Sequence, residues 1–302
     1  MYELAILARG GVLLTVWALA AGWPPGRLAA RLRRDGWQRI CRGAWAVPGK
    51  ETDWRVRETA LQLLRPRYVC HHGTAARLHR IEVLTGAGPV RGSGSSAGAG
   101  SRASLPPRDV CLRRGLRVTT AARTAADLIR ASGSREEAVV TADSALSRRV
   151  VEGVRRDPPV RYEELAAQLS VRRPGAPRAR AWLRLADPAA GSPAETVARL
   201  RMADASLFPE SQPPLRTPAG RPLHPDFLFR AAGLAVEVEG YAYHGTPRAH
   251  ERDIARFNAL QSCPEVHRVL RFTTREVLTR PDRMTATVRT ALEELGAATR
   301  AT

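Results

Sequence analysis

The sequence predicts an α/β protein of several domains, and three observations lead to this prediction. A length of 302 residues suits two or three domains with sizeable cores. Segments with helical periodicity alternate along the chain with short apolar segments typical of strands. A Gly/Pro/Ala linker at residues 187–192 marks the clearest late boundary. We therefore expect domains at residues 1–50, 51–190 and 191–302.

Residues 2–48 have the pattern of a small helical domain followed by a hairpin. Three helices are expected, separated by glycines or prolines: Tyr2–Arg9, Thr15–Ala21 with Thr15 as its cap, and Gly26–Arg34. The alternating residues that follow turn at Gly43, as a β-hairpin does. Three helices and a basic hairpin form a winged helix-turn-helix, whose third helix would enter the major groove of DNA.

Arginines cover the expected third helix and the hairpin, which favours binding of DNA by this domain. The candidate contacts are Arg27, Arg31, Arg33, Arg34, Arg39 and Arg42. The alternative is a small helical subdomain whose arginines are merely solvated. The net charge of +19 also favours a polyanionic partner. However, only Lys50 among the 48 basic residues is lysine, a bias that a GC-rich genome produces by itself.

The cysteines and the N-terminal segment indicate a cytoplasmic, soluble protein. The four cysteines are far apart and have no metal-ligand spacing, which is typical of free thiols in a reducing compartment. Glu3 stands where a signal peptide has basic residues, and Arg9 interrupts the apolar run that follows. No apolar run reaches the roughly 18 residues of a membrane span. We expect no membrane partner.

The middle region is expected to be α+β, with a flexible loop at residues 86–107. A helix is predicted at Arg55–Arg65, a short strand running into a helix at 68–79, and a strand pair at 110–118. Three histidines between residues 71 and 79 match no common metal site, so we interpret them as structural. Asp127 and Asp143 are expected to make caps, turns or packing contacts within helices.

Three carboxylates lie in two short apolar strands expected within residues 225–244 and joined by a tight turn. Glu237 and Glu239 would point to the same side of the second strand, roughly 7 Å apart. A two-residue turn would place Asp226 opposite Glu237, with Cβ atoms roughly 5 Å apart. A turn longer by one residue would point Asp226 away. Facing carboxylates on partly buried strands require a cation between them or a proton on one of them.

The elements around these strands form the order helix, strand, strand, helix, strand, helix, which predicts a mixed sheet with flanking helices. Ser192, Pro193 and Glu195 match a capping box, which by itself explains Glu195. If this helix packs over the sheet edge, Glu195 could also contribute to a metal site through water. The later helix at 250–261 offers Asp253 and Arg256, which we expect to form an ion pair that holds the helix against the site.

The carboxylates suit metal-assisted hydrolysis of a phosphodiester. Mg²⁺ needs only one or two carboxylates, together with waters and phosphate oxygens. Asp226 and Glu237 are the natural direct ligands of Mg²⁺ or Mn²⁺, and Glu195 the candidate for a contact through water. The chemistry does not distinguish DNA from RNA as the substrate.

The order Asp-x(10)-Glu-x-Glu, with Pro225 before Asp226, resembles the core of PD-(D/E)XK nucleases. The longer pattern Pro-Asp-Phe…Val-Glu-Val-Glu-Gly…His, with Glu-Arg-Asp…Arg and Val-Leu-Arg-Phe-Thr after it, is similar to small nuclease-like domains related to very-short-patch-repair endonucleases. The resemblance covers about residues 192–295. It implies that Glu239 is a further metal ligand and His244 a base or phosphate contact. Glu239 stands where the commonest form of the motif has lysine.

A second resemblance concerns the N-terminal part. The residues Arg-Arg-Asp-Gly-Trp-Gln-Arg-Ile-Cys-Arg-Gly-Ala-Trp-Ala-Val-Pro-Gly, from Arg33 onwards, look like the winged-helix domain of the abortive-infection type IV antitoxin family. This resemblance implies binding to an operator and a nucleotidyltransferase-like toxin as partner. Two functions therefore remain open: a DNA-targeted, metal-dependent endonuclease, and a non-catalytic antitoxin or regulator that uses the nuclease fold only for binding.

Overall fold

The chain divides into two compact units. The computed structural model of the protein describes residues 3–84, 105–239 and 247–300. The first unit lies within residues 1–79 and 88–124, and the second within 80–87 and 125–302. The described residues form a mixed α/β protein with 12 helices and several small sheets. None of these helices is long and apolar enough to cross a membrane.

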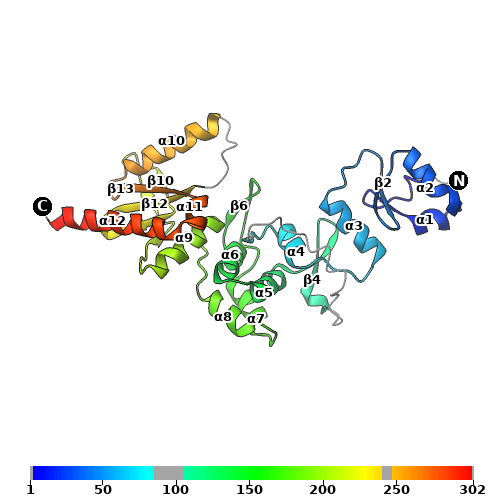
Figure 1. The fold of residues 1–302 in the computed structure, drawn as a ribbon, viewed down its shortest axis with the longest axis horizontal. Helices are drawn as coiled ribbons and strands as arrows, with labels where there is room; N and C mark the ends of the chain where they lie inside the picture. The colour runs from blue at the N-terminus through cyan, green and yellow to red at the C-terminus, as the bar shows by residue number, and fades with distance from the viewer. Residues whose placement is uncertain (1–2, 85–104, 240–246, 301–302) are drawn as a thin grey trace. The chain divides into compact units, whose positions relative to one another are not determined.

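The N-terminal part of the first unit combines two helices with a three-stranded antiparallel sheet of order β1-β3-β2 (Figure 1). Its elements are β1 (Val12–Leu14), α1 (Thr15–Ala20), α2 (Pro25–Arg34), β2 (Gln38–Cys41) and β3 (Ala44–Ala46). Gly43 lies between β2 and β3 with φ +86°, which confirms the predicted hairpin. Leu28 and Leu32 of α2 are buried against Trp37 and Trp45, and burial of each leucine side chain stabilises the fold by about 2 kcal/mol.

Two predictions for this part are wrong. The described residues before Gly10 form successive turns instead of a helix. Gly10 and Gly11 both have positive φ, and the apolar residues after them join the sheet as β1, where Val12 pairs with Ala46. Thr15 does not cap α1, because it is the first residue of the helix and Leu14 occupies the N-cap position; the Thr15 hydroxyl accepts a hydrogen bond from the Trp45 indole at 3.3 Å.

The rest of the first unit packs two helices against a hairpin. Its elements are α3 (Trp54–Leu64), α4 (His72–His79), η1 (Pro107–Asp109), β4 (Val110–Arg113) and β5 (Leu116–Thr119), and α5 (Ala121–Ala131) begins in it. The predicted helix and strand pair are thereby confirmed, with Asp53 capping α3 through the Val56 amide at 2.9 Å. Residues 86–104 of the predicted loop lie outside the described part, and Pro107 already begins η1.

The second unit begins with four helices around a short hairpin. The elements after α5 are α6 (Arg135–Leu146), β6 (Arg149–Val151), β7 (Val154–Arg156), α7 (Tyr162–Ser170) and α8 (Ala176–Leu183). Asp143 of α6 is fully buried and makes packing contacts, as predicted. Its carboxylate accepts hydrogen bonds from the Asp187 amide, the Thr196 hydroxyl and Arg199 at 2.7–3.0 Å. Asp127 of α5 likewise pairs with Arg130 at 2.8 Å.

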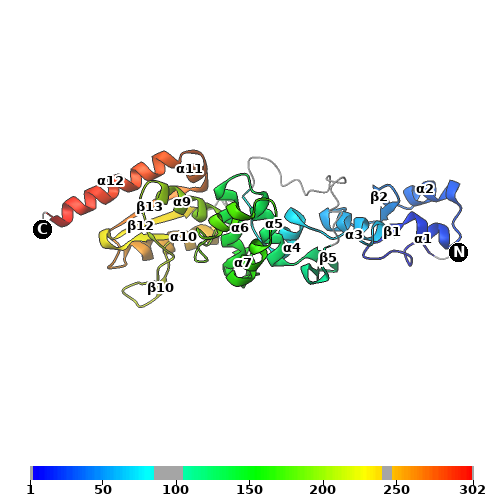
Figure 2. The ribbon, with the colours of Figure 1, turned by 90° about the horizontal axis from the view of Figure 1, so that it is seen from below.

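The C-terminal part of the second unit is a four-stranded mixed sheet of order β13-β12-β11-β8 with helices on both faces (Figures 1 and 2). β12 and β13 are parallel and the other pairs antiparallel. The strands are β8 (Glu210–Ser211), β11 (Phe227–Phe229), β12 (Leu234–Glu239) and β13 (Arg268–Thr273), with β9 (Leu215–Arg216) and β10 (Pro222–Leu223) as a separate hairpin. The helical segments are α9 (Pro193–Asp204), η2 (Arg230–Ala232), α10 (Pro247–Gln261), α11 (Thr274–Thr279) and α12 (Pro281–Arg300).

Alternate residues of the strands separate the two faces of this sheet. Leu234, Val236 and Val238 join residues of α9, α11 and α12 in one cluster. Ala235 lies on the other face, with Leu260 of α10. The predicted order of the main elements is confirmed, with two differences: the β9–β10 hairpin lies between α9 and β11, and the last helical segment is two helices, α11 and α12. The odd-numbered residues of β12, including Glu237 and Glu239, therefore face the side that α10 covers.

Candidate functional site

Asp226 and Glu237 face each other on neighbouring strands. Phe227 pairs with Val236, so the preceding Asp226 lies opposite Glu237. The Asp226 amide donates to the Glu237 carboxylate at 3.1 Å, and the Val238 amide donates to the Asp226 carboxylate at 2.8 Å. The predicted register is thus confirmed, and each carboxylate is held by a backbone N–H group.

The turn that sets this register differs from the predicted one. Four residues connect the strands, the three of η2 and then Gly233 with φ +63°. A four-residue loop keeps the same pairing as a two-residue turn, because it shortens each strand by one residue and leaves the other pairs unchanged. A Cβ atom on Gly233 would lie 2.5 Å from the His267 ring, so glycine is needed for both conformation and space.

Glu195 combines a helix-capping role with a place in the carboxylate cluster. The Ser192 hydroxyl accepts a hydrogen bond from the Glu195 amide at 3.2 Å, as the predicted cap requires. The Glu195 carboxylate accepts from the Gly191 amide at 2.8 Å and is also 3.0 Å from the Gln212 side chain. Glu195 is only 6% exposed. The sheet edge thus brings Glu195 close to Asp226, as the sequence predicted.

Gln212 joins the two acids and was not among the predicted site residues. Its side-chain nitrogen donates to Glu195 and to Asp226, both at 3.0 Å. Its backbone has φ +49°, a left-handed conformation that is uncommon for a residue other than glycine. Such conformations persist where surrounding contacts impose them, often at functional sites. Only the position of Gln212 in the short segment between α9 and the hairpin could have suggested it.

Arginines from α10 and β13 hold the other carboxylates. Arg256 donates to both oxygens of Glu237, at 2.9 and 3.1 Å. Arg271, opposite Glu237 in the parallel register, contacts Glu239 at 2.5 Å and Asp253 at 2.7 Å. The predicted ion pair between Asp253 and Arg256 is therefore wrong, although both residues do hold α10 against the sheet. Arg256 pairs with a strand residue because the Glu237 carboxylate is only 14% exposed, against 46% for Asp253, and a more buried carboxylate attracts a cation more strongly.

Arg271 is the second residue that sequence reasoning missed. It lies within a strand that the sequence predicts to be buried, and a charged side chain in such a strand requires a partner. That signal could have identified it. Glu239 shares a face with Glu237, as predicted, but its carboxylate lies beside Arg271 instead of in the cluster. Its role as a metal ligand stays a prediction, and His244 lies outside the described residues.

The electrostatics of the cluster favour a bound cation. Burial raises the pKa of Asp226 to about 8, and the neighbouring Glu195 and Glu237 add to this effect. Burial also raises the pKa of Glu237, while Arg256 acts in the opposite direction. Carboxyl groups with raised pKa values retain protons near neutral pH unless a positive charge replaces them. Near neutral pH, Asp226 therefore holds a proton unless a cation takes its place.

The residues present fit a magnesium ion with few protein ligands. Among the residues that the structure describes, no three Asp, Glu, His or Cys side chains form a metal-holding group. Mg²⁺ does not require one, since one or two carboxylates with waters suffice. Gln212 places a hydrogen-bond donor between Glu195 and Asp226, and rotation of its amide would present an oxygen there instead. With the Gln212 amide rotated, Asp226, Glu237 and Gln212 would each offer an oxygen to such an ion.

The predicted DNA-binding arginines are all on the surface. Arg27, Arg31, Arg33 and Arg34 are exposed on α2, and Arg39 and Arg42 are exposed on or beside the β2–β3 hairpin. Arg31 pairs with Asp35 at 2.5 Å. Arg33 lies over the Trp45 ring at 6.0 Å. The arrangement leaves a basic helix and a basic hairpin available to a polyanion.

The histidines of the middle region make local contacts. The Nδ1 atoms of His71 and His72 are 2.6 Å apart, and His79 is bonded to the Thr119 carbonyl oxygen at 2.8 Å. Burial lowers the pKa of His79. These contacts agree with the structural interpretation of this segment.

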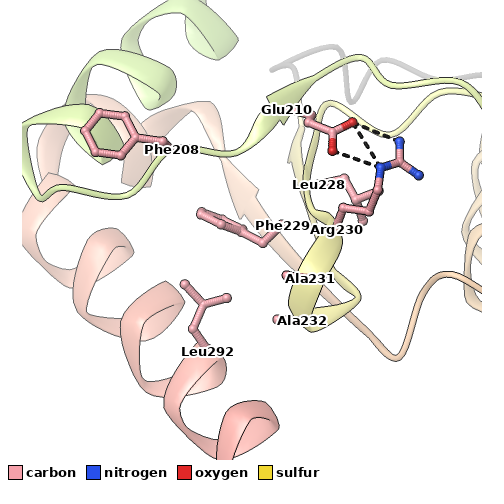
Figure 3. Close-up of a pocket in the computed structure, with 8 residues that line it drawn as sticks. All are labelled: Phe208, Glu210, Leu228, Phe229, Arg230, Ala231, Ala232 and Leu292. Carbon is pink, nitrogen blue, oxygen red and sulfur yellow. Dashed lines mark hydrogen bonds and ion pairs between the residues drawn. The ribbon is translucent and has the colours of Figure 1, made fainter.

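A surface cavity of about 610 Å³ lies at the opposite end of the β11–β12 hairpin from the carboxylates (Figure 3). Arg230 in its wall is bonded to Glu210 at 2.8 Å, so its charge is already paired. Figure 3 shows Phe208 and Leu292 across the opening from Phe229. The remaining lining residues are Leu228, Ala231 and Ala232. This apolar lining offers no group for phosphate chemistry.

The comparisons with known proteins add no assignment to this geometry. No protein-family model, no curated protein and no solved structure matches the chain.

Proposed function

We propose that the C-terminal part of the second unit is a PD-(D/E)XK-like domain that hydrolyses phosphodiester bonds of DNA with Mg²⁺ or Mn²⁺. The observation that carries the proposal is that Asp226 and Glu237 lie opposite each other on neighbouring strands, where the pKa of Asp226 is raised to about 8. The order of α9, the antiparallel β11–β12 pair and the parallel β13 also supports this domain type. The same chemistry would act on RNA, and the assay below includes it.

Asp226 and Glu237 would hold the metal, with the Gln212 amide oxygen and, through water, Glu195 beside it. The bound metal would supply charge neutralisation at the phosphate and activation of the attacking water. Backbone amides fix both acids: the Val238 amide orients Asp226, and the Asp226 amide orients Glu237. The chain therefore provides a rigid pair of ligands on sheet strands, which positions groups better than loops do.

Arg256 and Arg271 have positioning roles in this proposal. Arg256 holds Glu237 through two hydrogen bonds, and Arg271 neutralises Glu239 where the common motif has lysine. Arginine stays protonated and cannot accept a proton from water. Proton transfer is therefore assigned to His244, and a further metal contact to Glu239, as the resemblance implies.

Targeting is assigned to the N-terminal part, which we infer to be a winged helix-turn-helix. The order of α1, α2 and the β2–β3 hairpin corresponds to the last two helices and the wing of this domain, while turns and β1 take the place of the expected first helix. The exposed arginines on α2 and the hairpin suit the phosphates of duplex DNA, because one guanidinium group can bind two phosphate oxygens at once. Duplex DNA bound there is the expected substrate of the acidic site.

The proposal is tested by cleavage of supercoiled plasmid, mismatched duplex and RNA in the presence of Mg²⁺ or Mn²⁺. Asp226→Ala and Glu237→Ala should each lower the cleavage rate at least about 100-fold, because two ligands hold the metal. Asp282→Ala, which removes an exposed carboxylate at the start of α12, is the matched control and should leave the rate unchanged. Equal cleavage by the wild type and both site variants would refute the assignment.

The second candidate function is a non-catalytic antitoxin or regulator with a nucleotidyltransferase-like toxin as its partner. The observation that favours it is the Glu239–Arg271 pair at the lysine position. Under this function, the full chain would bind an operator through α2 and the hairpin, and neither Mg²⁺ nor Mn²⁺ would bind at Asp226. Calorimetric titration of Mn²⁺ into the wild type and Asp226→Ala separates the two functions. A neighbouring toxin gene would support the regulator.

A further inference from the structure

The segment 171–186 is the least neutralised part of the second unit. It contains α8 and the turn before it, and its arginines are Arg172, Arg173, Arg178, Arg180 and Arg184. No Asp or Glu occurs between Val171 and Ala186. All five arginines are exposed. Among the α-helices described in the second unit, α8 alone combines arginine with a complete lack of acidic residues.

About half of the other arginines described in this unit form ion pairs with carboxylates. Examples are the ion pairs of Arg135 with Asp204, of Arg149 with Glu82 and of Arg268 with Glu294. In contrast, none of the five arginines of segment 171–186 has a carboxylate partner within the residues that the structure describes. The arginine bias of the chain does not by itself explain this segment, because five arginines without an ion pair to the described residues occur here within 16 residues that include no Asp or Glu.

The position of the arginines on α8 produces a basic outer face. Ala176, Ala179 and Leu183 are buried and attach α8 to its neighbours, which are α6 and α7. At 100° per residue, the opposite face carries Pro177 and Ala181 at its centre. Arg178 and Arg184 flank this centre on its two sides. Short side chains between two guanidinium groups would allow a phosphate chain to approach the helix closely.

Two of the arginines are already fixed in place. Arg178 lies over the Trp182 ring at 4.6 Å and donates to the Ser132 carbonyl oxygen at 3.0 Å. Arg180 donates to the Leu169 carbonyl oxygen at 3.2 Å. Arg180 and Arg184 are four residues apart, and like charges at this spacing repel each other unless an anion lies between them.

We propose that segment 171–186 is a second nucleic-acid-binding surface, which contacts the phosphate backbone without reading sequence. Guanidinium groups bind phosphate oxygens in a bidentate manner, and unpaired arginines along a helix match the repeated charge of a nucleic acid. A lipid surface fits less well, because Pro177 and Ala181 on the outer face offer no long apolar side chain. The inference extends the proposed function, since it places a contact for the substrate apart from the carboxylates.

The experiment measures binding of the full chain in EDTA, where cleavage cannot occur. The variant Arg172→Gln/Arg173→Gln/Arg184→Gln removes three charges whose side chains make no hydrogen bond or ion pair with the described residues. The probes are a 30-base-pair DNA duplex, single-stranded DNA and an RNA duplex. The slope of log K against log salt is negative, and each lost phosphate contact reduces its magnitude by about 0.9 on duplex DNA. The loss of three contacts should therefore reduce the magnitude by about 2.7. Affinity at 0.1 M salt should fall at least about tenfold.

Two matched variants make the result specific. Arg275→Gln/Arg280→Gln/Arg283→Gln removes three exposed charges around α11 and α12, near Glu276, and should change the slope by less than about 1. Arg172→Lys/Arg173→Lys/Arg184→Lys keeps the charge and should retain most of the slope. Circular dichroism verifies the fold of each variant.

An unchanged slope for the segment variant, or an equal loss in the α11–α12 variant, would overturn the proposal. Preferential loss of binding to vesicles of phosphatidylglycerol and phosphatidylcholine, with DNA binding intact, would also overturn it and assign the surface to membranes. Absence of cleavage with a reduced slope would reject the nuclease proposal and leave this one standing.

Discussion

Replacing Asp226 by Asn should stabilise the metal-free protein while abolishing its response to metal. In the folded state the pKa of Asp226 is about 8, against an ordinary value of 3.8, because of burial and the nearby Glu195 and Glu237. The folded state thus holds a proton that the unfolded chain releases between these two pH values. Wild-type stability therefore declines as pH rises from about 4 to 8. Asparagine has no such proton, so its advantage grows over the same interval.

The magnitude follows from the two pKa values. At 1.36 kcal/mol per tenfold change in acidity, ionising Asp226 in the folded protein costs at most about 6 kcal/mol. A proton that moves to Glu237 relieves part of this repulsion, so we expect about 2–4 kcal/mol for Asp226→Asn at pH 9. Asparagine can still accept from the Val238 amide and face a rotated Gln212 amide. Near pH 4 the two proteins should be almost equally stable.

Urea denaturation in EDTA at pH 4, 7 and 9 measures this difference, and repeating it with saturating Mg²⁺ tests metal binding. Metal at 100 times its Kd should add about 2.7 kcal/mol to the wild type and nothing to the variant. Asp282→Asn is the control: it weakens a favourable charge at the start of α12 and should cost about 0.5 kcal/mol at pH 7 and 9. An Asp226→Asn variant that is less stable than the wild type at pH 9 would refute the electrostatic reasoning.

Three further variants test other contacts by the same denaturation assay. Arg256→Gln should cost about 1 kcal/mol without metal, because Glu237 loses a half-exposed partner, and Mg²⁺ should recover most of the loss. Thr196→Val should lower stability by about 2 kcal/mol above pH 7 and by less at pH 5. Burial raises the pKa of Asp143 to about 6, and its ionised carboxylate depends more strongly on the Thr196 hydroxyl than its protonated form does. A loss of stability that is larger at pH 5 would contradict this reasoning. Gly175→Ala should lower stability by at least about 1 kcal/mol, because Gly175 has φ +79° and a Cβ atom there would lie 2.7 Å from the carbonyl oxygen of Arg130 in α5. An unchanged midpoint of urea denaturation would exclude that clash.

Local patterns allowed the acidic hairpin to be predicted with the correct register. Alternation in β12 places Glu237 and Glu239 on one face, and the apolar residues of β11 fix which residues can pair. The turn itself was predicted incorrectly, yet the register survived because a four-residue loop preserves the pairing. Burial of alternate residues determines register more strongly than the turn type does.

Contacts between distant elements could not be read from local patterns. Gln212 reaches Glu195 and Asp226 only because β8 pairs with β11, and nothing in its immediate neighbours indicates this. Similarly, Asp253 and Arg256 are three residues apart on one helix, which predicts a pair between them. The parallel pairing of β12 with β13 supplies Arg271 as a competing partner. The strand β1 was missed for the same reason, because Val12–Leu14 pair with β3, which follows much later in the sequence.

The charge at this end of the sheet opposes the charge of the whole chain. Five carboxylates lie beside two guanidinium groups there, so the local charge is about −3 when all seven groups are ionised. The whole chain has a net charge of +19. The carboxylates belong to Glu195, Asp226, Glu237, Glu239 and Asp253. A nucleic acid attracted by the arginines elsewhere would be repelled at this point unless a cation first bound to the acids. Metal binding and nucleic-acid binding at the cluster should therefore strengthen each other by the same factor, because coupling between two bound ligands is reciprocal.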